Sequence, residues 1–249
     1  MIKRRAIVIG AALSCLHATL GAAPPNAALN STRSPREATP PRFGTLLHSD
    51  DFRTGLDRWR IETQQPGTIT ARNGILDIDV PAGATLWFEP ELGSPIAIVF
   101  EATAVSAGGL HDRVSDLNCF WMARNRDGAT PVYAHKRSGE FAEYNDLRTY
   151  YVGLGGNSNT TTRFRRYIGD RELRPLLPEH DLSSPEVLLR PNQKQTIWLV
   201  ANNRRIEYWR DGRRLIAFND DQPYEHGWFA LRTTQSHLRI ERLRIYALR

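Results

Sequence analysis

The chain has 249 residues, of which 41% are hydrophobic and two are cysteines. These counts exclude collagen-like, disulfide-stapled and wholly disordered proteins, and the length allows a sizeable hydrophobic core. Lysine and arginine outnumber aspartate and glutamate by 33 to 27, and the formal net charge of +6 would suit a polyanionic partner.

The first residues predict an exported protein. A basic start at residues 3–5 precedes an apolar run at 6–16 and small residues at 20–23. This order is typical of a bacterial signal peptide, and the run is shorter than the about 20 residues of a transmembrane helix. We therefore expect residues 1–23 to be a signal peptide and the protein to be secreted or periplasmic. Cleavage removes Lys3, Arg4 and Arg5 and lowers the net charge to +3, so we expect no nucleic-acid partner.

Residues 24–44 are rich in proline, alanine, serine and threonine, which predicts a flexible tether. Residues 45–249 are expected to form a single β-sandwich domain. The first clear strand is 75–80, which alternates apolar and polar residues after the turn Asn73-Gly74. The nearly all-apolar segment 97–101 predicts a central strand that is buried on both faces.

The second half of the chain predicts further strands at short spacing. They cover residues 196–201, 205–209, 214–218, 228–232 and 238–245, with tight turns at Asn202-Asn203 and Asp211-Gly212. No segment of ten or more residues has an apolar stripe of helical period, so helices should be few and short. The pattern predicts an all-β sandwich, jelly roll or barrel, and Cys119, within an apolar run, is predicted to be buried.

Several short motifs carry a resemblance to known families. They are Asp51-Phe52, Leu56, Trp59, Asn73 to Leu76, Phe100-Glu101 and Gly227 to Arg232. Together these motifs resemble the concanavalin A-like lectin/glucanase superfamily. Residues 116–121, 150–157 and 159–167 resemble a family of secreted bacterial proteins of unknown function. The resemblance implies a jelly roll of two curved antiparallel sheets and a role in polysaccharide utilisation, without a catalytic assignment.

The segment from Tyr150 to Tyr167 is the best candidate for a functional site. In a strand, Tyr151 and Gly153 share one face, and glycines in strands often mark the close approach of a ligand. If Phe164 points inward, then Arg163, Arg165 and Tyr167 line the open face. The loop 155–160 between the strands is rich in glycine and in side-chain amides that hydrogen-bond sugar hydroxyls.

This combination suits β-elimination in an acidic polysaccharide or oligosaccharide. A uronate lyase neutralises the substrate carboxylate with arginine or an amide, while tyrosine or histidine moves the protons. We therefore predict catalytic roles for Tyr151, Arg163, Arg165 and His135, with His180 as another candidate histidine. The predicted substrate-binding residues are Asn118, Trp121, Asn157, Asn159, Trp87 and Tyr167. The alternative is that both arginines are surface charges and Tyr151 is a packed aromatic residue.

Two other functions stay open at this point. A glycoside hydrolase needs a pair of carboxylates, and the candidates are Glu101, Asp112, Asp116, Glu140 and Glu143. A non-catalytic lectin-like module would stack exposed tryptophans on sugar rings, for which Trp87 and Trp121 are the candidates. No cofactor is expected, although Asp50-Asp51 or Asn219 to Asp221 offers oxygen ligands for a structural Ca²⁺. The oligomeric state is not indicated by the sequence.

Overall fold

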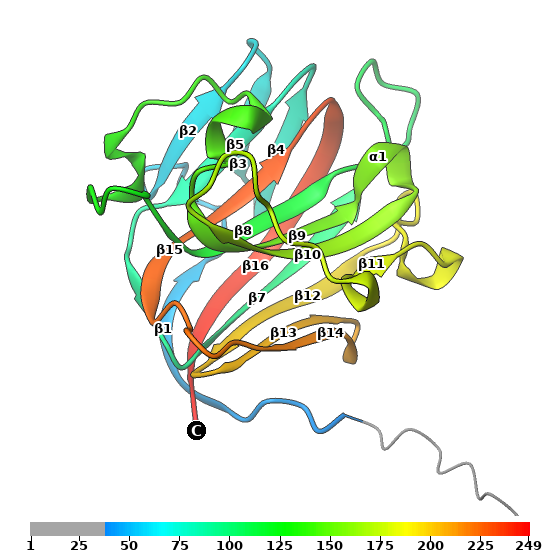
Figure 1. Ribbon diagram of the computed structural model, residues 1–249. Coiled ribbons are helices and arrows are strands. Elements are labelled where there is room, and N and C mark those ends of the chain that lie inside the picture. Colours follow the sequence, from blue (N-terminus) through cyan, green and yellow to red (C-terminus); the bar gives the residue numbers. More distant parts are fainter. Residues whose placement is uncertain (1–37) are drawn as a thin grey trace, which may run out of the picture. The chain divides into compact units, whose positions relative to one another are not determined.

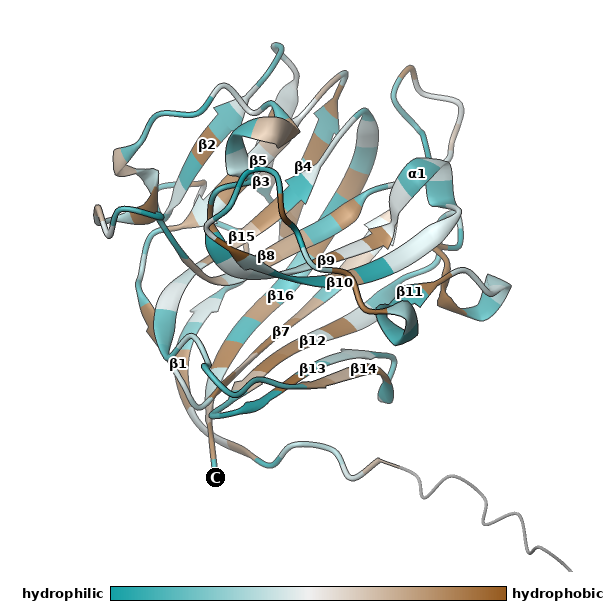
Figure 2. Cartoon of the chain, in the orientation of Figure 1, coloured by the Kyte–Doolittle hydropathy of each residue, from teal (hydrophilic) through white to brown (hydrophobic). Residues whose placement is uncertain are grey.

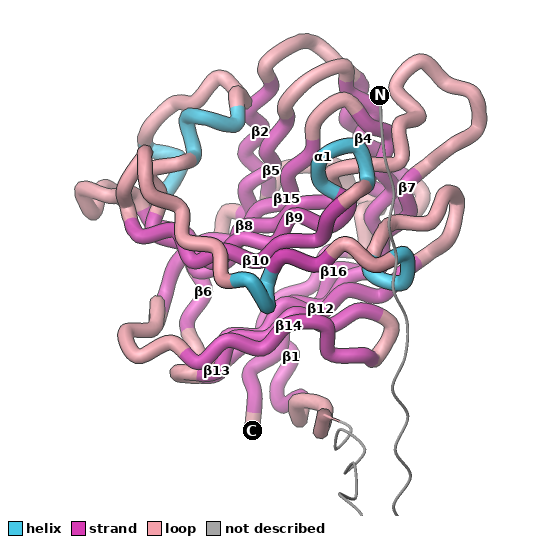
Figure 3. The backbone as a smooth tube through the Cα atoms, turned by 45° about the vertical axis from the view of Figure 1, so that its right-hand side comes forward, coloured by secondary structure: helices cyan, strands magenta, loops and turns pink. Residues whose placement is uncertain are grey.

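Two antiparallel β-sheets pack face to face in the computed structural model, which describes residues 38–249 (Figure 1). The predicted signal peptide and residues 24–37 of the predicted tether lie outside the described residues. The first strand, β1, begins at Phe43. In this part of the chain, short helical turns occur only in connections between strands, as Figure 3 shows. Among residues 38–249, no helix has the length and hydrophobicity needed to cross a bilayer.

The first sheet contains the long C-terminal strand near its centre. Its strand order is β14-β13-β12-β7-β16-β4-β3, and β1 pairs with the end of β16. The strands are β1 (Phe43–Asp50), β3 (Thr68–Arg72), β4 (Ile75–Val80), β7 (Ile96–Ala104), β12 (Gln195–Asn202), β13 (Arg205–Arg210), β14 (Arg213–Asn219) and β16 (Ser236–Leu248).

The second sheet contains the segment that the sequence singles out as a functional site. Its order is β11-β10-β9-β8-β15-β5-β2, and β6 pairs with β15. The strands are β2 (Trp59–Thr63), β5 (Ala84–Phe88), β6 (Leu92–Gly93), β8 (Leu117–Arg124), β9 (Arg148–Gly155), β10 (Thr161–Ile168), β11 (Asp181–Leu182) and β15 (His226–Thr233). Short turns are η1 (Val132–Ala134), η2 (Phe141–Tyr144), α1 (Gly156–Asn159), η3 (Pro178–His180) and η4 (Pro185–Val187).

Tight turns set the register of the hairpins. Asn73 and Gly74 join β3 to β4, and Asp211 and Gly212 join β13 to β14, all with positive φ. Two successive residues of positive φ form the turn whose twist matches paired strands, and asparagine, aspartate and glycine adopt it most readily. Figure 2 shows hydrophobic and hydrophilic residues alternating along many of the strands. The structure confirms the strands predicted from these patterns and the scarcity of helices.

The main core lies between the sheets. The first sheet contributes residues such as Leu76, Ile98 and Phe100, and the second contributes Trp121, Tyr150 and other buried side chains. Cys119 is also in this core, and burial raises the pKa of its thiol well above its usual range. The predicted buried thiol is confirmed.

A second apolar cluster covers part of the outer face of the second sheet. It contains Trp87, Phe120 and Tyr151 from the strands, together with Val132 and Tyr144 from the loop 125–147. Because this loop packs on the sheet, only part of the outer face is left open to solvent. The loop therefore forms one wall of a cleft beside the uncovered strands.

Candidate functional site

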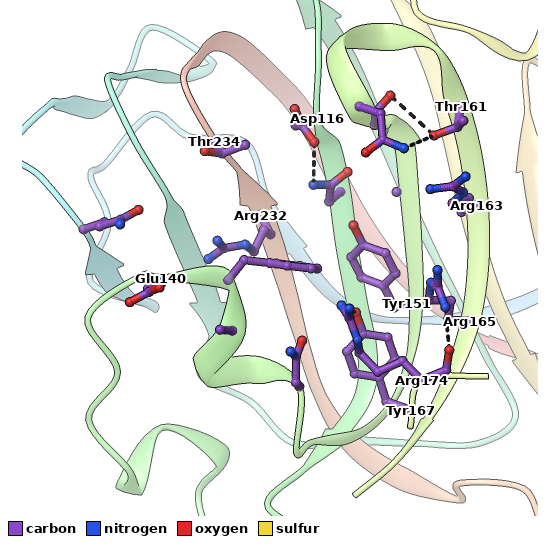
Figure 4. A pocket seen from close by; sticks show the side chains of 18 residues that line it. Asp116, Glu140, Tyr151, Thr161, Arg163, Arg165, Tyr167, Arg174, Arg232 and Thr234 are labelled. Atoms are coloured by element: carbon purple, nitrogen blue, oxygen red, sulfur yellow. Dashed lines mark hydrogen bonds between the residues drawn. The ribbon is translucent and has the colours of Figure 1, made fainter. Parts of the chain in front are cut away.

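A cleft of about 610 Å³ opens on the outer face of the second sheet. Strands β8, β9, β10 and β15 form its floor, and loops supply its walls (Figure 4). The residues that line it are Gln64, Asp116, Asn118, Glu140, Phe141, Ala142, Asn145, Tyr151, Gly153, Gly156, Asn157, Thr161, Arg163, Arg165, Tyr167, Arg174, Arg232 and Thr234.

Strand register places the polar side chains of the floor in one row. Arg232 on β15 is opposite Asn118 on β8, which is opposite Gly153 on β9, which is opposite Arg163 on β10. In the next row, Arg165 is opposite Tyr151. Side chains of one row share a face of the sheet, so these groups all point into the cleft.

Tyr151 lies at the centre of the floor and is 8% exposed. Its ring packs against Phe120, Phe141 and Tyr167, with centroid distances of 5.3, 5.7 and 5.4 Å. The Tyr151 hydroxyl lies over Gly153, where a Cβ atom would be 2.7 Å from the hydroxyl oxygen. Burial, and then the neighbouring Tyr167 and Asp116, raise the pKa of Tyr151 well above its usual range. The phenol therefore keeps its proton at neutral pH and can act as a proton donor.

The lining of the cleft is rich in positive charge, with four arginines against the two carboxylates Asp116 and Glu140. Arg163 holds Asp181 through two hydrogen bonds, of 2.7 and 3.1 Å. Arg165 donates to the backbone carbonyl of Arg174, and burial lowers the pKa of Arg165. Within residues 38–249, Arg165, Arg174 and Arg232 form no ion pair with a carboxylate. An anionic ligand is the natural partner for these three groups.

Asp116 is the carboxylate on the floor side of the cleft. Ser115 Oγ donates a hydrogen bond to it, and Asn118 Nδ2 is 3.4 Å from its Oδ1 atom. Burial raises the pKa of Asp116 despite these hydrogen bonds. The carbonyl oxygens of Asn118 and Asn145 are buried and accept no hydrogen bond within the described residues. The lining therefore contains a carboxylate of raised pKa and two buried amide oxygens that accept no hydrogen bond from the described residues.

The structure brings together most of the residues that the sequence predicts for the site. Tyr150, Val152 and Phe164 point into the main core, as predicted from strand alternation. The predicted residues that line the cleft are Tyr151, Arg163, Arg165, Asn118, Asn157 and Tyr167. Arg163 is nevertheless bound to Asp181, which limits its freedom to hold a substrate.

Four other predicted residues do not reach the cleft. Trp87 and Trp121 are both 0% exposed, so the prediction that they stack on a sugar is wrong. Trp121 packs between the sheets, and Trp87 lies beneath the loop 125–147, where its indole N–H donates to Glu62. His135 lines a different cavity and pairs with Asp127 at 2.9 Å. The Asn159 amide exchanges two hydrogen bonds with the Leu189 backbone.

The remaining candidates also have other partners. His180 is buried against Phe164 and Phe218. Of the five carboxylates considered for hydrolysis, Asp116 and Glu140 line the cleft, whereas Glu101, Asp112 and Glu143 do not.

Sequence reasoning missed Arg232 and Arg174. Arg232 carried a signal, because it shares one strand face with Trp228 and Ala230 and is a charged residue at the end of an apolar run. Arg174 comes from the loop after β10 and carried no such signal. Its place over the cleft depends on how that loop folds back.

In each of the two loops considered for Ca²⁺, a carboxylate accepts hydrogen bonds from groups of the protein itself. Asp50 accepts hydrogen bonds from the Phe52 backbone and the Trp59 indole. Asp220 accepts them from Tyr150 and Arg166. Within residues 38–249, histidine, cysteine and acidic side chains do not gather in a group of three or more.

Comparisons with solved structures show the same fold in proteins of low sequence identity. A Bacillus subtilis protein of unknown function with a galectin-like fold superposes with a TM-score of 0.65 at 15% identity, covering 84% of this chain and 98% of that one. An endo-β-1,3-glucanase from Pyrococcus furiosus gives 0.57 at 9% identity, covering 82% and 94%. The carbohydrate binding module CBM66 from B. subtilis gives 0.50 at 9% identity, covering 77% and 97%. These likenesses confirm the predicted concanavalin A-like jelly roll.

Sequence comparison identifies a family. No match is found among curated proteins. The model of a family described as a domain of unknown function, DUF6250, matches residues 78–243, which include the whole floor of the cleft. Since the match covers more than half of the chain, the protein belongs to the DUF6250 family.

Proposed function

We propose that this protein is exported and acts on an acidic, uronate-containing polysaccharide or oligosaccharide by β-elimination in the cleft around Tyr151. The observation that carries the proposal is the excess of arginines in the cleft, three of which have no carboxylate partner within residues 38–249. The likeness in fold to a glucanase and a carbohydrate binding module supports a glycan as the ligand. A neutral glycan would leave the arginines without counter-charges.

The cleft provides a group for each step of an elimination. Arg165, opposite Tyr151, would pair with the uronate carboxylate and so acidify the C5 proton. No histidine lines the cleft in the described part of the chain, so Asp116, with its raised pKa, is the proposed base. The C5–H electrons form the C4–C5 double bond while the C4–O bond breaks. Tyr151, which is protonated at neutral pH, donates its proton to the leaving oxygen. A proton then passes from Asp116 back to Tyr151 and restores both groups.

A hydrolase is the second candidate, because Asp116 and Glu140 both line the cleft. Figure 4 shows Asp116 beside the floor strands and Glu140 on the loop, with Arg232 between them. A hydrolase would use one as acid and the other as base or nucleophile. The two reactions give different products and are separable in one assay.

The test is to incubate the purified protein with a panel of uronate-containing and neutral glycans. Ultraviolet absorbance detects unsaturated uronates, and a reducing-end assay counts all cleavages. We expect both signals to rise together on an acidic glycan. Reducing ends without absorbance would replace the lyase by the hydrolase, and binding without products would leave a lectin-like module.

The Tyr151→Phe variant tests the proposed proton donor. It keeps the buried ring but removes the hydroxyl, so we expect the turnover rate to fall by about 100-fold or more while glycan binding remains. Tyr246→Phe is the matched control, because Tyr246 stacks on Phe43 in the first sheet and does not line the cleft. Full activity of Tyr151→Phe would remove Tyr151 from the mechanism.

A further inference from the structure

Arg232 is a nearly buried cation on the floor of the cleft. It is 3% exposed, and within residues 38–249 it forms no ion pair, although Asp116 is close enough to favour its charged form. Its Nη1 atom donates to Thr85 Oγ1 at 2.7 Å and to the Gly139 carbonyl at 2.8 Å. The guanidinium also lies over the rings of Phe141 and Tyr144, 5.1 and 4.8 Å from their centroids. Burying a charged group that forms no ion pair costs free energy.

The surroundings hold the Arg232 guanidinium in one position and leave part of it free. An arginine has five N–H donors, and the Nε and Nη2 donors of Arg232 have no acceptor within the described residues. The backbone of Gly83 makes room for Nη2, because a Cβ atom there would be 2.9 Å from it. The side chain is therefore fixed by β5, by the loop 125–147 and by aromatic rings, with donors left over for a ligand.

Arg232 is too far from Arg163 and Arg165, the two cleft arginines of β10, to serve the same acid group. Arg232 and Arg163 are in one row, separated by β8 and β9, and three strand spacings amount to about 14 Å between their backbones. The two side chains do not lean toward each other. Arg232 is bonded to Thr85 on β5, and Arg163 is bonded to Asp181 on β11. Figure 4 shows Arg232 on one side of Tyr151 and Arg163 and Arg165 on the other.

We propose that Arg232 forms a second anion subsite, so that the ligand is an oligosaccharide with acid groups on at least two of its residues. This proposal rests on the proposed function, in which Arg165 holds the carboxylate of the reacting uronate. Arg165 is on β10 like Arg163, so its backbone is also three strand spacings, about 14 Å, from that of Arg232. This separation is wider than one sugar ring, so the two subsites meet acids on different residues. Gln64 and Thr234, which also line this end of the cleft, offer hydrogen bonds to the same residue of the ligand. The preferred substrate is then a run of acidic sugars.

The test compares oligosaccharides of the same sugar that differ in the number of free carboxylates. Trimers of galacturonic, mannuronic and guluronic acid are titrated beside the same trimers esterified at all but one carboxyl group. Calorimetry is performed in the Tyr151→Phe background, which is expected to slow turnover and keeps every arginine. We expect the fully charged form of the preferred trimer to bind about ten-fold or more tightly than its singly charged form.

Variants of Arg232 complete the test. Arg232→Gln should bring the ratio of the two affinities close to one, and Arg232→Lys should give an intermediate ratio. Arg239→Gln is the control, since Arg239 is exposed on the first sheet and pairs with Asp77. Thermal unfolding checks that each variant is folded. If Arg232→Gln does not fold, Arg232→Lys gives the affinity ratio in its place, and equal binding of the charged and esterified trimers would still overturn the proposal.

The outcomes separate this proposal from the proposed function. Equal binding of the fully and singly charged trimers by the protein with Arg232 would overturn the second subsite and leave an acidic glycan as the ligand. An affinity ratio that Arg232→Gln does not change would do the same. Failure to bind any acidic glycan would overturn both proposals.

Discussion

At the scale of single residues, the absence of a side chain at position 153 shapes the site. The Tyr151 ring leans over Gly153, and its hydroxyl oxygen occupies the space that a β-carbon would need. The two residues share the outer face of β9, because they are two positions apart on one strand. The glycine thus sets where the proposed proton donor lies.

Gly153→Ala should displace the Tyr151 hydroxyl, because the new Cβ atom would be 2.7 Å from it. We expect the turnover rate on an acidic glycan to fall by about 100-fold, since catalysis is sensitive to misplacements of about 1 Å. Gly93→Ala is the control, as a Cβ atom at Gly93 meets no atom within 4 Å. Unchanged turnover in Gly153→Ala would show that the position of Tyr151 does not matter.

At the scale of elements, the loop 125–147 is fastened to the sandwich by close backbone contact. Gly83, before β5, faces Gly139 so closely that a Cβ atom on Gly83 would be 2.1 Å from the Gly139 carbonyl oxygen. The same carbonyl accepts the hydrogen bond from Arg232. Within the loop, Arg137 donates to Asn125 Oδ1 and to the Val132 carbonyl. One contact thus positions both a wall of the cleft and the proposed anion subsite.

Gly83→Ala should push the loop away from the sheet. We expect faster proteolysis within residues 134–147. We also expect weaker glycan binding, because Phe141 and the Gly139 carbonyl, which accepts a hydrogen bond from Arg232, move with the loop. Limited proteolysis followed by mass spectrometry locates the cut sites. Gly93→Ala should be cut as slowly as the unaltered protein. An equally slow rate for Gly83→Ala would contradict the idea that the contact between Gly83 and Gly139 holds the loop on the sheet.

The loop that precedes β8 is held by a carboxylate whose pKa is low. Asp112 accepts hydrogen bonds from the backbone N–H groups of Gly109 and Ala107 and from His237, and its pKa falls from 3.8 to about 2. A pKa lowered by folding stabilises the protein above the unfolded value, and this contribution is lost as pH falls through the folded value.

We therefore expect Asp112 to contribute stability above about pH 4 that disappears as the pH is lowered to about 2. Urea unfolding between pH 2 and pH 5 measures this contribution. Asp112→Asn should reduce stability above pH 4 and flatten its decline in acid. Asp57→Asn is the control, because Asp57 is an exposed aspartate. An unaltered profile in Asp112→Asn would contradict this role.

At the scale of the whole molecule, a buried polar cluster joins the two sheets. Asp220 follows β14 of the first sheet and is 4% exposed. It accepts hydrogen bonds from Arg166 on β10 and from Tyr150 on β9, both in the second sheet. The Tyr150 hydroxyl also accepts a hydrogen bond from the backbone N–H of Tyr224. The cluster therefore connects the loop after β14 to two strands of the opposite layer.

Asp220→Ala should lower the free energy of unfolding by about 3 kcal/mol, because it leaves the Arg166 charge and the Tyr150 hydroxyl without their partner. Urea denaturation gives the difference. Asp221→Ala is the matched control, since the Asp221 side chain is 81% exposed and its pairing with Arg204 is on the surface. Equal stability of the two variants would mean that the cluster does not hold the sheets together.

Local patterns predicted the fold and much of the floor of the site. Alternation at period two is a property of the strand itself, so the sequence alone separated Tyr151 from Tyr150 and placed Arg163 and Arg165 opposite Phe164. That Phe164 points inward was a condition of the prediction, and the structure meets it. Turn chemistry at Asn73-Gly74 and Asp211-Gly212 likewise depends only on neighbouring residues.

Only the tertiary structure decided which residues reach the cleft. Trp87 is on the outer face of its strand, yet a loop from far along the chain covers it, and His135 on that loop points into another cavity. Arg232, on a strand far from β10 in sequence, joins the row of Arg163 through pairing across β8 and β9. Strand pairing and loop packing are contacts between distant segments, which a local pattern does not contain. The sequence determined the face of each strand, and the long-range contacts determined which part of that face is open.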